Sequence, residues 1–292
     1  MRKQNYLNNK DMLKEIHRSK LSYCYVLDEE YERFDTIVES MDDIQNPEVI
    51  QTAKENRARQ LSTQAYEKAY IEWYDSDSRK QSQKPKQINF KVDPETIDEE
   101  SLVFRLMTFE HVPLEPGRKN KPKTVADHHS KCNFPHFKHF AYMNGQLKEC
   151  LRSHWEGGLD NGKFNTQHGA ITPNLAKMFI KLCERYSMRS NWRGYTYVDE
   201  MRSHALLQLS QIGLQFNELK SENPFAYYTA AVTNSFTRVL NLEKRNQNIR
   251  DDLLQEAGQM PSWTRQIEHE MAERAKWDEK ADKERKEHGY NV

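Results

Sequence analysis

The sequence predicts a mostly α-helical fold: a three-helix bundle, preceded by a large α+β or irregular region and followed by a charged helical C-terminal tail. In residues 166–250 apolar side chains recur at spacings of three and four in three successive stretches, which is the period of amphipathic helices. Residues 31–165 lack this regularity. After residue 250, eleven acidic against seven basic side chains indicate a solvated helix or disorder. We therefore divide the chain into residues 1–30, 31–165, 166–250 and 251–292.

The first half of the chain contains two expected helices. Asn9 is a suitable cap for a short helix that runs toward Tyr23, because its side-chain oxygen can accept from a free backbone N–H. Pro47 opens a longer helical stretch that reaches Trp73, since proline fits the first turn of a helix.

The following region is more irregular. Residues 75–86 contain no apolar side chain, so we expect a linker or mobile loop there. Ile88–Val92 alternates apolar and polar residues like a strand, and Leu102–Met107 is a second candidate strand. Prolines then interrupt any regular element in a basic segment that reaches Lys138.

Three amphipathic helices are expected in residues 170–242. Asn174 is the expected cap of the first, Asp199 and Glu200 lie in the first turn of the second, where the helix dipole favours acids, and Pro224 opens the third. Their apolar stripes are Leu175, Met178, Phe179, Leu182 and Tyr186; Val198, Met201, Ala205, Leu209, Ile212 and Phe216; and Phe225, Tyr228, Val232, Phe236, Val239 and Leu240.

Composition excludes several classes of protein. The 292 residues carry 44 basic and 44 acidic side chains, so the net charge is zero and does not indicate a class of binding partner. Phosphate-binding glycine loops, GxSxG and HExxH are all missing from the sequence, so we expect no enzyme. Four scattered cysteines indicate reduced thiols. Without a long apolar stretch or a signal sequence, we expect a soluble intracellular protein with no membrane partner.

The third helix combines aromatic and basic residues. Between residues 223 and 250, Arg238, Lys244, Arg245 and Arg250 oppose one acid, Glu243. Aromatic rings stack on unpaired bases and basic side chains hold phosphates, so this combination is typical of nucleic-acid binding. Helical periodicity alone favours the plainer interpretation that its aromatic residues are core.

The order of the three helices resembles region 2 of bacterial sigma factors, and the late-transcription sigma factors of T-even-like bacteriophages most of all. In that family an Asn-Pro-x-Ala-Tyr segment is followed by small residues, Asn, Phe and a basic run. Here these are Asn223, Pro224, Ala226, Tyr227, Asn234, Phe236 and Lys244-Arg245. The opening Asn5–Leu13 is similar too. The resemblance covers residues 3–20 and 170–250.

The resemblance implies two functional surfaces. The helix over residues 197–216 would dock on the clamp helices of the largest subunit of bacterial core RNA polymerase, and the next helix would face promoter DNA. The implied polymerase-binding residues are Asp199, Glu200, Arg202, Gln208 and Gln211. The implied DNA-binding residues are Phe225, Tyr227, Tyr228, Asn234, Arg238, Lys244 and Arg245, with the two tyrosines stacking on flipped bases and Asn234 reading a base edge.

The implied function is recruitment of the polymerase to AT-rich −10-like promoters and help in opening them, in the cytoplasm of an infected bacterial host. A phage co-activator is left open as a further partner. Primary sigma factors wedge the duplex open with a tryptophan pair, which an ungapped alignment places on Ala230 and Ala231. Alanine cannot wedge, so Tyr227, Tyr228 or the polymerase would have to do so. We expect neither a −35-reading domain nor a sliding-clamp epitope.

Two other functions fit the same residues. A single-stranded nucleic-acid-binding protein that needs no polymerase would bind tightly as the isolated chain. A protein–protein interaction or virion component would keep every activity after Arg238, Lys244 and Arg245 are replaced together by alanine.

The middle region contains possible zinc ligands within twelve residues, namely His128, His129, Cys132, His136 and His139. One thiol among histidines is a weak signal, and Pro135 limits the geometry. A basic, aromatic loop that contacts DNA or polymerase is the favoured interpretation, so we expect no metal and no other cofactor.

Overall fold

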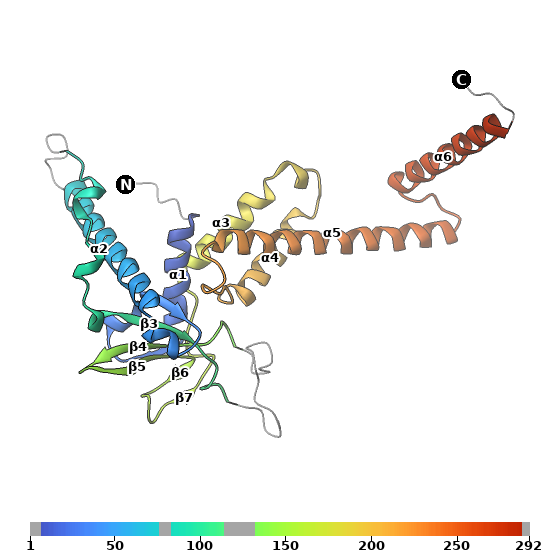
Figure 1. The fold of residues 1–292 in the computed structure, drawn as a ribbon. Coiled ribbons are helices and arrows are strands. Elements are labelled where there is room, and N and C mark those ends of the chain that lie inside the picture. The colour runs from blue at the N-terminus through green and yellow to red at the C-terminus, as the bar shows by residue number, and fades with distance from the viewer. Residues whose placement is uncertain (1–6, 76–82, 114–131, 288–292) are drawn as a thin grey trace.

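The computed structural model describes residues 7–75, 83–113 and 132–287 (Figure 1). Within these ranges the protein is mostly helical, as predicted, and the middle region supplies four strands of a five-stranded sheet, whose remaining strand lies before residue 31. Figure 1 shows α1 between this sheet and helices α3, α4 and α5. No described helix combines the length and apolarity that crossing a bilayer requires.

The sheet has the strand order β1-β5-β4-β3-β2. Its strands are β1 (Cys24–Val26), β2 (Thr36–Val38), β3 (Val103–Met107), β4 (Phe137–Met143) and β5 (Gln146–Ser153). Only the β2–β3 pair is parallel. Asn144 and Gly145 join β4 to β5, both with positive φ, as a tight hairpin turn requires. A separate two-stranded ribbon pairs β6 (Trp155–Glu156) with β7 (Lys163–Phe164).

The strand predicted over Leu102–Met107 is confirmed as β3, but the one predicted over Ile88–Val92 is wrong. Gln87–Phe90 forms a 3-10 helix instead. This segment packs beside α2 (Pro47–Asp75): the backbone N–H of Val92 donates to the Ser62 hydroxyl, and the Phe90 ring lies 6.1 Å from that of Tyr66. Phe90 and Val92 therefore lie against a helix and not in a sheet, while Ile88 is 77% exposed.

Helix α2 covers one face of the sheet. Phe104 and Leu106 of β3 face it and pack in one buried cluster with Ala53 and Ala58. The side chains of a strand alternate between its faces, so Arg105 lies on the opposite face, toward α1.

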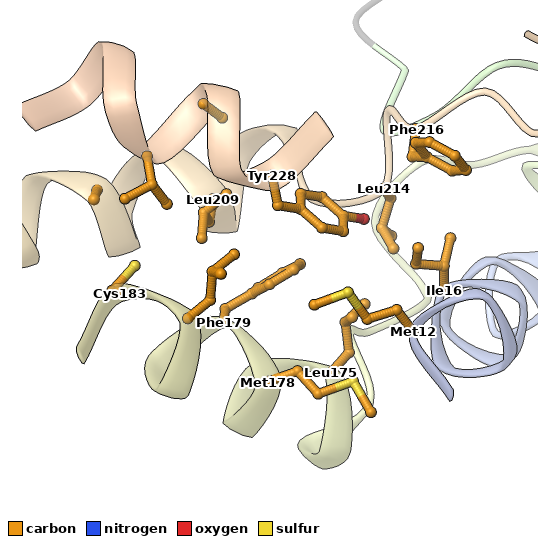
Figure 2. Packing of buried hydrophobic residues seen from close by; sticks show 14 of the residues in the cluster. Met12, Ile16, Leu175, Met178, Phe179, Cys183, Leu209, Leu214, Phe216 and Tyr228 are labelled. Carbon is orange, nitrogen blue, oxygen red and sulfur yellow. The ribbon is translucent and has the colours of Figure 1, made fainter. Parts of the chain in front are cut away.

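Four helices share the main core: α1 (Asn9–Leu21), α3 (Pro173–Ser187), α4 (Val198–Ile212) and α5 (Pro224–Glu256). Figure 2 shows Met12, Phe179 and Tyr228 meeting from three of these helices. The cluster continues through Phe137 and Leu151 into β4 and β5. The four predicted chain boundaries stay a prediction, although α1, the sheet and the bundle pack on a common core.

The predicted caps of two helices were close but not correct. Asn8, not Asn9, caps α1 by accepting from the N–H of Asp11 at 2.7 Å. Thr172, not Asn174, caps α3 by accepting from the N–H of Leu175. In both places two polar residues compete at the helix start, and the sequence alone does not rank them.

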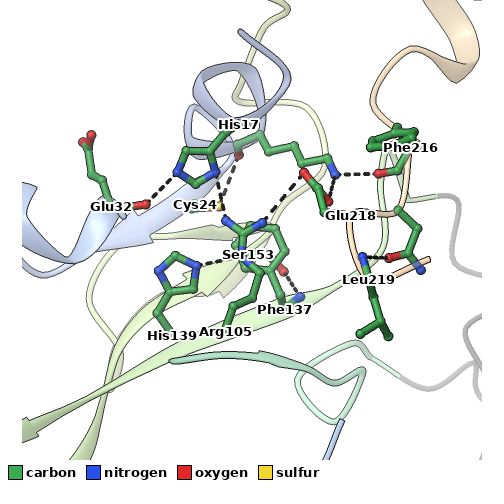
Figure 3. A network of polar contacts seen from close by, with 12 residues as sticks. His17, Cys24, Glu32, Arg105, Phe137, His139, Ser153, Phe216, Glu218 and Leu219 are labelled. Carbon is green, nitrogen blue, oxygen red and sulfur yellow. Dashed lines mark hydrogen bonds and ion pairs between the residues drawn. The ribbon is translucent and has the colours of Figure 1, made fainter. Parts of the chain in front are cut away.

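A buried polar network joins the sheet to the helices (Figure 3). The Arg105 guanidinium donates to Nε2 of His139 and to Nδ1 of His17, both at 2.9 Å, and lies between the rings of Phe34 and Phe137. Both histidines donate their other ring N–H to backbone carbonyls, so they accept from Arg105 as neutral rings. Burial lowers the pKa of His17 to about 3, consistent with this neutral state.

Glu218, in the loop after α4, connects this network to the bundle. Its carboxylate accepts from Lys20 Nζ at 2.6 Å and lies 3.8 Å from Arg105 Nη1. Burial alone would raise the pKa of Glu218, but the adjacent Lys20 and Arg105 charges outweigh it and hold that pKa below its usual value. Lys20 also donates to the Phe216 carbonyl. One carboxylate thus ties α1, β3 and the α4–α5 loop together.

The third predicted helix is longer than expected. It was expected to end near Leu242, but α5 continues to Glu256, and the predicted helical tail is α6 (Trp263–Glu287). At the corner between them, the backbone N–H and the hydroxyl of Ser262 donate to Asp251 at 2.8 and 2.7 Å. Figure 1 shows the end of α5 and all of α6 extending away from the bundle.

Candidate nucleic-acid and polymerase interface

One side of α5 carries four of the predicted DNA-binding residues. Tyr227, Asn234, Arg238 and Arg245 follow one another at spacings of seven, four and seven, so they lie along one stripe of the helix about 27 Å long. Asn241 lies three and four residues from its neighbours in this stripe and is exposed. Sequence reasoning missed Asn241, although the same spacing could have found it. We call these five residues the α5 stripe.

The basic side chains on and beside the α5 stripe are free to bind an anion. Arg238, Lys244 and Arg245 are exposed, and none makes an ion pair or a side-chain hydrogen bond within the described parts of the chain. Lys244 lies next to Arg245 and about 100° around the helix from it. Phosphate oxygens prefer such partners, because charged donors make the strong hydrogen bonds. The geometry therefore provides three cations in about two turns of helix.

The two adjacent tyrosines of α5 have different environments. Tyr227 is half-buried at the edge of the core, with its ring 5.6 Å from that of Phe216. Tyr228 is completely buried, packs edge-on against Phe179 and donates its hydroxyl to the Gly213 carbonyl. Burial raises the pKa of Tyr228, so it stays neutral. The prediction that Tyr228 stacks on a base is therefore corrected, since its ring fills the core at the end of α4 (Figure 2).

We expect Tyr228→Phe to lower the free energy of unfolding by about 1–3 kcal/mol, because the buried Gly213 carbonyl loses its donor while the ring remains. Urea denaturation of the two proteins measures the difference. A Thr237→Ala variant, altered at an exposed position of α5, should stay within about 0.5 kcal/mol of the unaltered chain. Equal stability of Tyr228→Phe and the unaltered chain would contradict this role.

Phe225 is placed apart from the other predicted DNA-binding residues. It lies two residues before Tyr227, which puts it about 200° around α5 from the stripe. Its side chain is 36% exposed, and its backbone N–H donates to the Asn9 side chain of α1 at 3.1 Å. The structure therefore brings Phe225 together with α1 and not with Asn234 or Arg238.

Helix α4 packs its buried stripe on α3 and α5 and leaves the opposite side open. Glu200, His204, Leu207 and Gln211, at spacings of four, three and four, lie along that open side. Leu207 lies at the centre of this open side and is 57% exposed. Because the apolar stripe of α4 faces α3 and α5, helical periodicity predicts only polar residues at the position of Leu207. His204 and Leu207 were missed because neither belongs to the motif of the resemblance.

The other predicted polymerase-binding residues flank this open side of α4. Asp199 is exposed and accepts from Arg202 at 3.0 Å, whereas Gln208 is half-buried on the opposite edge. An apolar side chain inside a ring of polar and charged groups is the usual arrangement of a protein-binding surface. The α4 surface, which we define as Asp199, Glu200, His204, Leu207 and Gln211, is therefore suited to a protein partner.

The structure separates the residues considered for zinc. His128 and His129 lie outside the described residues. His139 is committed to the buried network, where its two ring nitrogens contact Arg105 and the Tyr31 carbonyl. Cys132 and His136 instead lie close to a third residue, His154, so that nitrogen and sulfur atoms of all three are within 4.8 Å of one another.

In comparisons with known proteins, no family model, curated protein or solved structure matches this chain.

Proposed function

We propose that this protein is a phage-type sigma factor, a non-enzymatic subunit that recruits bacterial core RNA polymerase to AT-rich −10-like promoters in the cytoplasm of the infected host. The observation that carries the proposal is the α5 stripe with its adjacent Lys244: exposed basic side chains that make no ion pair within the described residues, on the same long helix as the aromatic Tyr227. The polymerase would carry out all of the catalysis of RNA synthesis.

The proposal divides the work between two helices. The α4 surface binds the polymerase, through its acidic first turn and the exposed Leu207. On α5, Arg238, Lys244 and Arg245 hold phosphates, and Asn234 and Asn241 present amides to base edges. Tyr227 is the aromatic residue left to stack on an unpaired base, since Tyr228 is core. Its side chain has to swing away from Phe216 to do so.

Charge reversal on α4 tests the polymerase contact. We expect Asp199→Lys/Glu200→Lys to abolish co-elution of the chain with core polymerase, because like charges at a docked surface cost several kcal/mol. Gel filtration of equimolar chain and core, preferably from the native host, measures this. The helix dipole also loses two favourable acids, so thermal unfolding of the variant is recorded in parallel.

A matched control distinguishes this contact from a general charge effect. Asp278→Lys/Glu279→Lys reverses two exposed acids of α6, and co-elution should be unchanged. Failure of the unaltered chain to bind a competent core would contradict the proposal. Tight binding of single-stranded nucleic acid by the chain alone would then favour a polymerase-independent function.

A further inference from the structure

A cluster of potential metal ligands lies beside the sheet, apart from the α4 surface and the α5 stripe. Cys132 and His136 precede β4, and His154 connects β5 to β6. Each contributes one sulfur or nitrogen atom, and these three atoms are within 4.8 Å of one another. Both histidines are buried and Cys132 is half-buried. Thiolate and imidazole are the ligands that zinc prefers in proteins.

The two histidine rings have the spacing of ligands to one ion. Nδ1 of His136 lies 3.2 Å from Nδ1 of His154. Two nitrogens bound to a tetrahedral zinc ion at the usual Zn–N distance are about 3.3 Å apart. A thiolate on the same ion would lie about 3.6 Å from each nitrogen. The Cys132 side chain is the least buried of the three, and its rotation would bring the sulfur to that distance from both nitrogens.

His154 combines an unusual backbone conformation with a buried ring that is only partly hydrogen-bonded. Its φ is +53°, in the left-handed region that residues other than glycine rarely adopt, and its side chain is fully buried. Nε2 of His154 has no hydrogen-bond partner among the described residues, whereas its Nδ1 is hydrogen-bonded to Nδ1 of His136. Strained backbone at a buried polar residue is typical of a functional position.

The surroundings of the cluster suit a metal site. The ring of Phe134 stacks on that of His154 with centroids 4.0 Å apart, and the Phe164 ring lies 5.9 Å away with its plane tilted by 29°. Such an apolar shell lowers the local dielectric and strengthens the attraction between an ion and a thiolate.

We propose that Cys132, His136 and His154 bind one zinc ion, with a water molecule as the fourth ligand. On binding, the Cys132 thiol releases its proton to solvent and the sulfur bonds to the metal as thiolate. The Nδ1 proton of the hydrogen bond between the two histidines moves to Nε2 of its own ring, so that both Nδ1 atoms offer a lone pair to the ion. The ion links the segment before β4 to the β5–β6 junction, next to Tyr23 at the end of α1. Its binding free energy adds to the stability of the folded protein. This site is independent of polymerase binding.

Metal content of the purified full chain tests the site. We expect about one zinc ion per chain by elemental analysis, and cobalt(II) added to the zinc-free protein should give the thiolate-to-cobalt charge-transfer absorption. A chelator should lower the midpoint of thermal unfolding. A chain without zinc that also gives no cobalt spectrum would overturn the proposal, and would leave His136 and His154 as a hydrogen-bonded pair.

Variants assign the ligands. Cys132→Ser should remove the charge-transfer band, and His154→Gln should weaken zinc affinity by more than about 100-fold, which exceeds the loss that removal of an outer ligand partner causes. His204→Gln, at an exposed histidine of α4, is the matched control and should leave metal binding unchanged. If His154→Gln does not fold, Cys132→Ser still decides the outcome. Unchanged metal binding in Cys132→Ser would overturn the assignment.

Discussion

Replacement of Arg238, Lys244 and Arg245 together by alanine is expected to lower promoter-directed initiation by at least about 100-fold while binding to core polymerase persists. Even 1 kcal/mol for each lost phosphate contact sums to about 3 kcal/mol, and each 1.4 kcal/mol is a factor of ten. Because all three side chains are exposed and make no ion pair with any residue that the structure describes, the fold should be unaffected. Abortive-initiation assays on an AT-rich −10 template, with co-elution of the same variant, measure both properties.

The salt dependence of promoter binding adds a second readout. The slope of log affinity against log salt concentration should fall by about 3, since three phosphate contacts are removed. Replacement of Arg274, Lys276 and Lys280 of α6 by alanine removes the same charge from another exposed helix and should change neither initiation nor slope. If the α5 variant initiates normally, α5 does not contact the promoter, and an interaction or virion role becomes the better explanation.

Glu218→Gln is expected to destabilise the protein by about 3–5 kcal/mol. The substitution removes the negative charge between Lys20 and Arg105, which are 1% and 0% exposed, so both cations lose their buried counter-charge. Glu218 joins α1, β3 and the α4–α5 loop, and the variant should therefore also loosen the sheet from the bundle. Urea denaturation followed by far-UV circular dichroism measures the loss, and hydrogen exchange of β3 and α1 reports the loosening.

The control for this change lies in the same loop. Glu222 is exposed, and Glu222→Gln should alter the free energy of unfolding by no more than about 0.5 kcal/mol. A Glu218→Gln variant as stable as Glu222→Gln would show that Lys20 and Arg105 do not depend on the carboxylate. Arg105 would then be held by its two histidines and by the rings of Phe34 and Phe137 alone.

Local sequence patterns predicted the helices of the bundle well. The stripes of α3, α4 and α5 could be found because helical periodicity depends only on neighbours three and four residues apart. The same property explains the error at residues 88–92, where a short alternation does not reveal whether the partner is a strand or a helix. The end of α5 was missed because its second half is mostly polar, and its few apolar residues at helical spacing, Leu242, Ile249 and Leu253, are widely separated.

Contacts between distant residues could not be predicted. Lys20 and Glu218 are 198 positions apart, and no local pattern connects them. For the same reason the zinc set considered from sequence contained His139, which is near Cys132 in the chain, and omitted His154, which is 18 positions beyond His136. On α5, the spacing of the residues identified which of them share a side of the helix. It did not decide whether Tyr228 lies in the core or on the surface, and the structure places it in the core.

The measurement that tests the central claim most directly is run-off transcription by purified host core polymerase with and without this chain. The template carries an AT-rich −10 element and no −35 element. We predict that the chain converts an inactive core into one that makes a transcript of defined length, and that Tyr227→Ala reduces the yield. A core that makes no such transcript, although the chain is folded and in excess, would contradict the sigma-factor proposal.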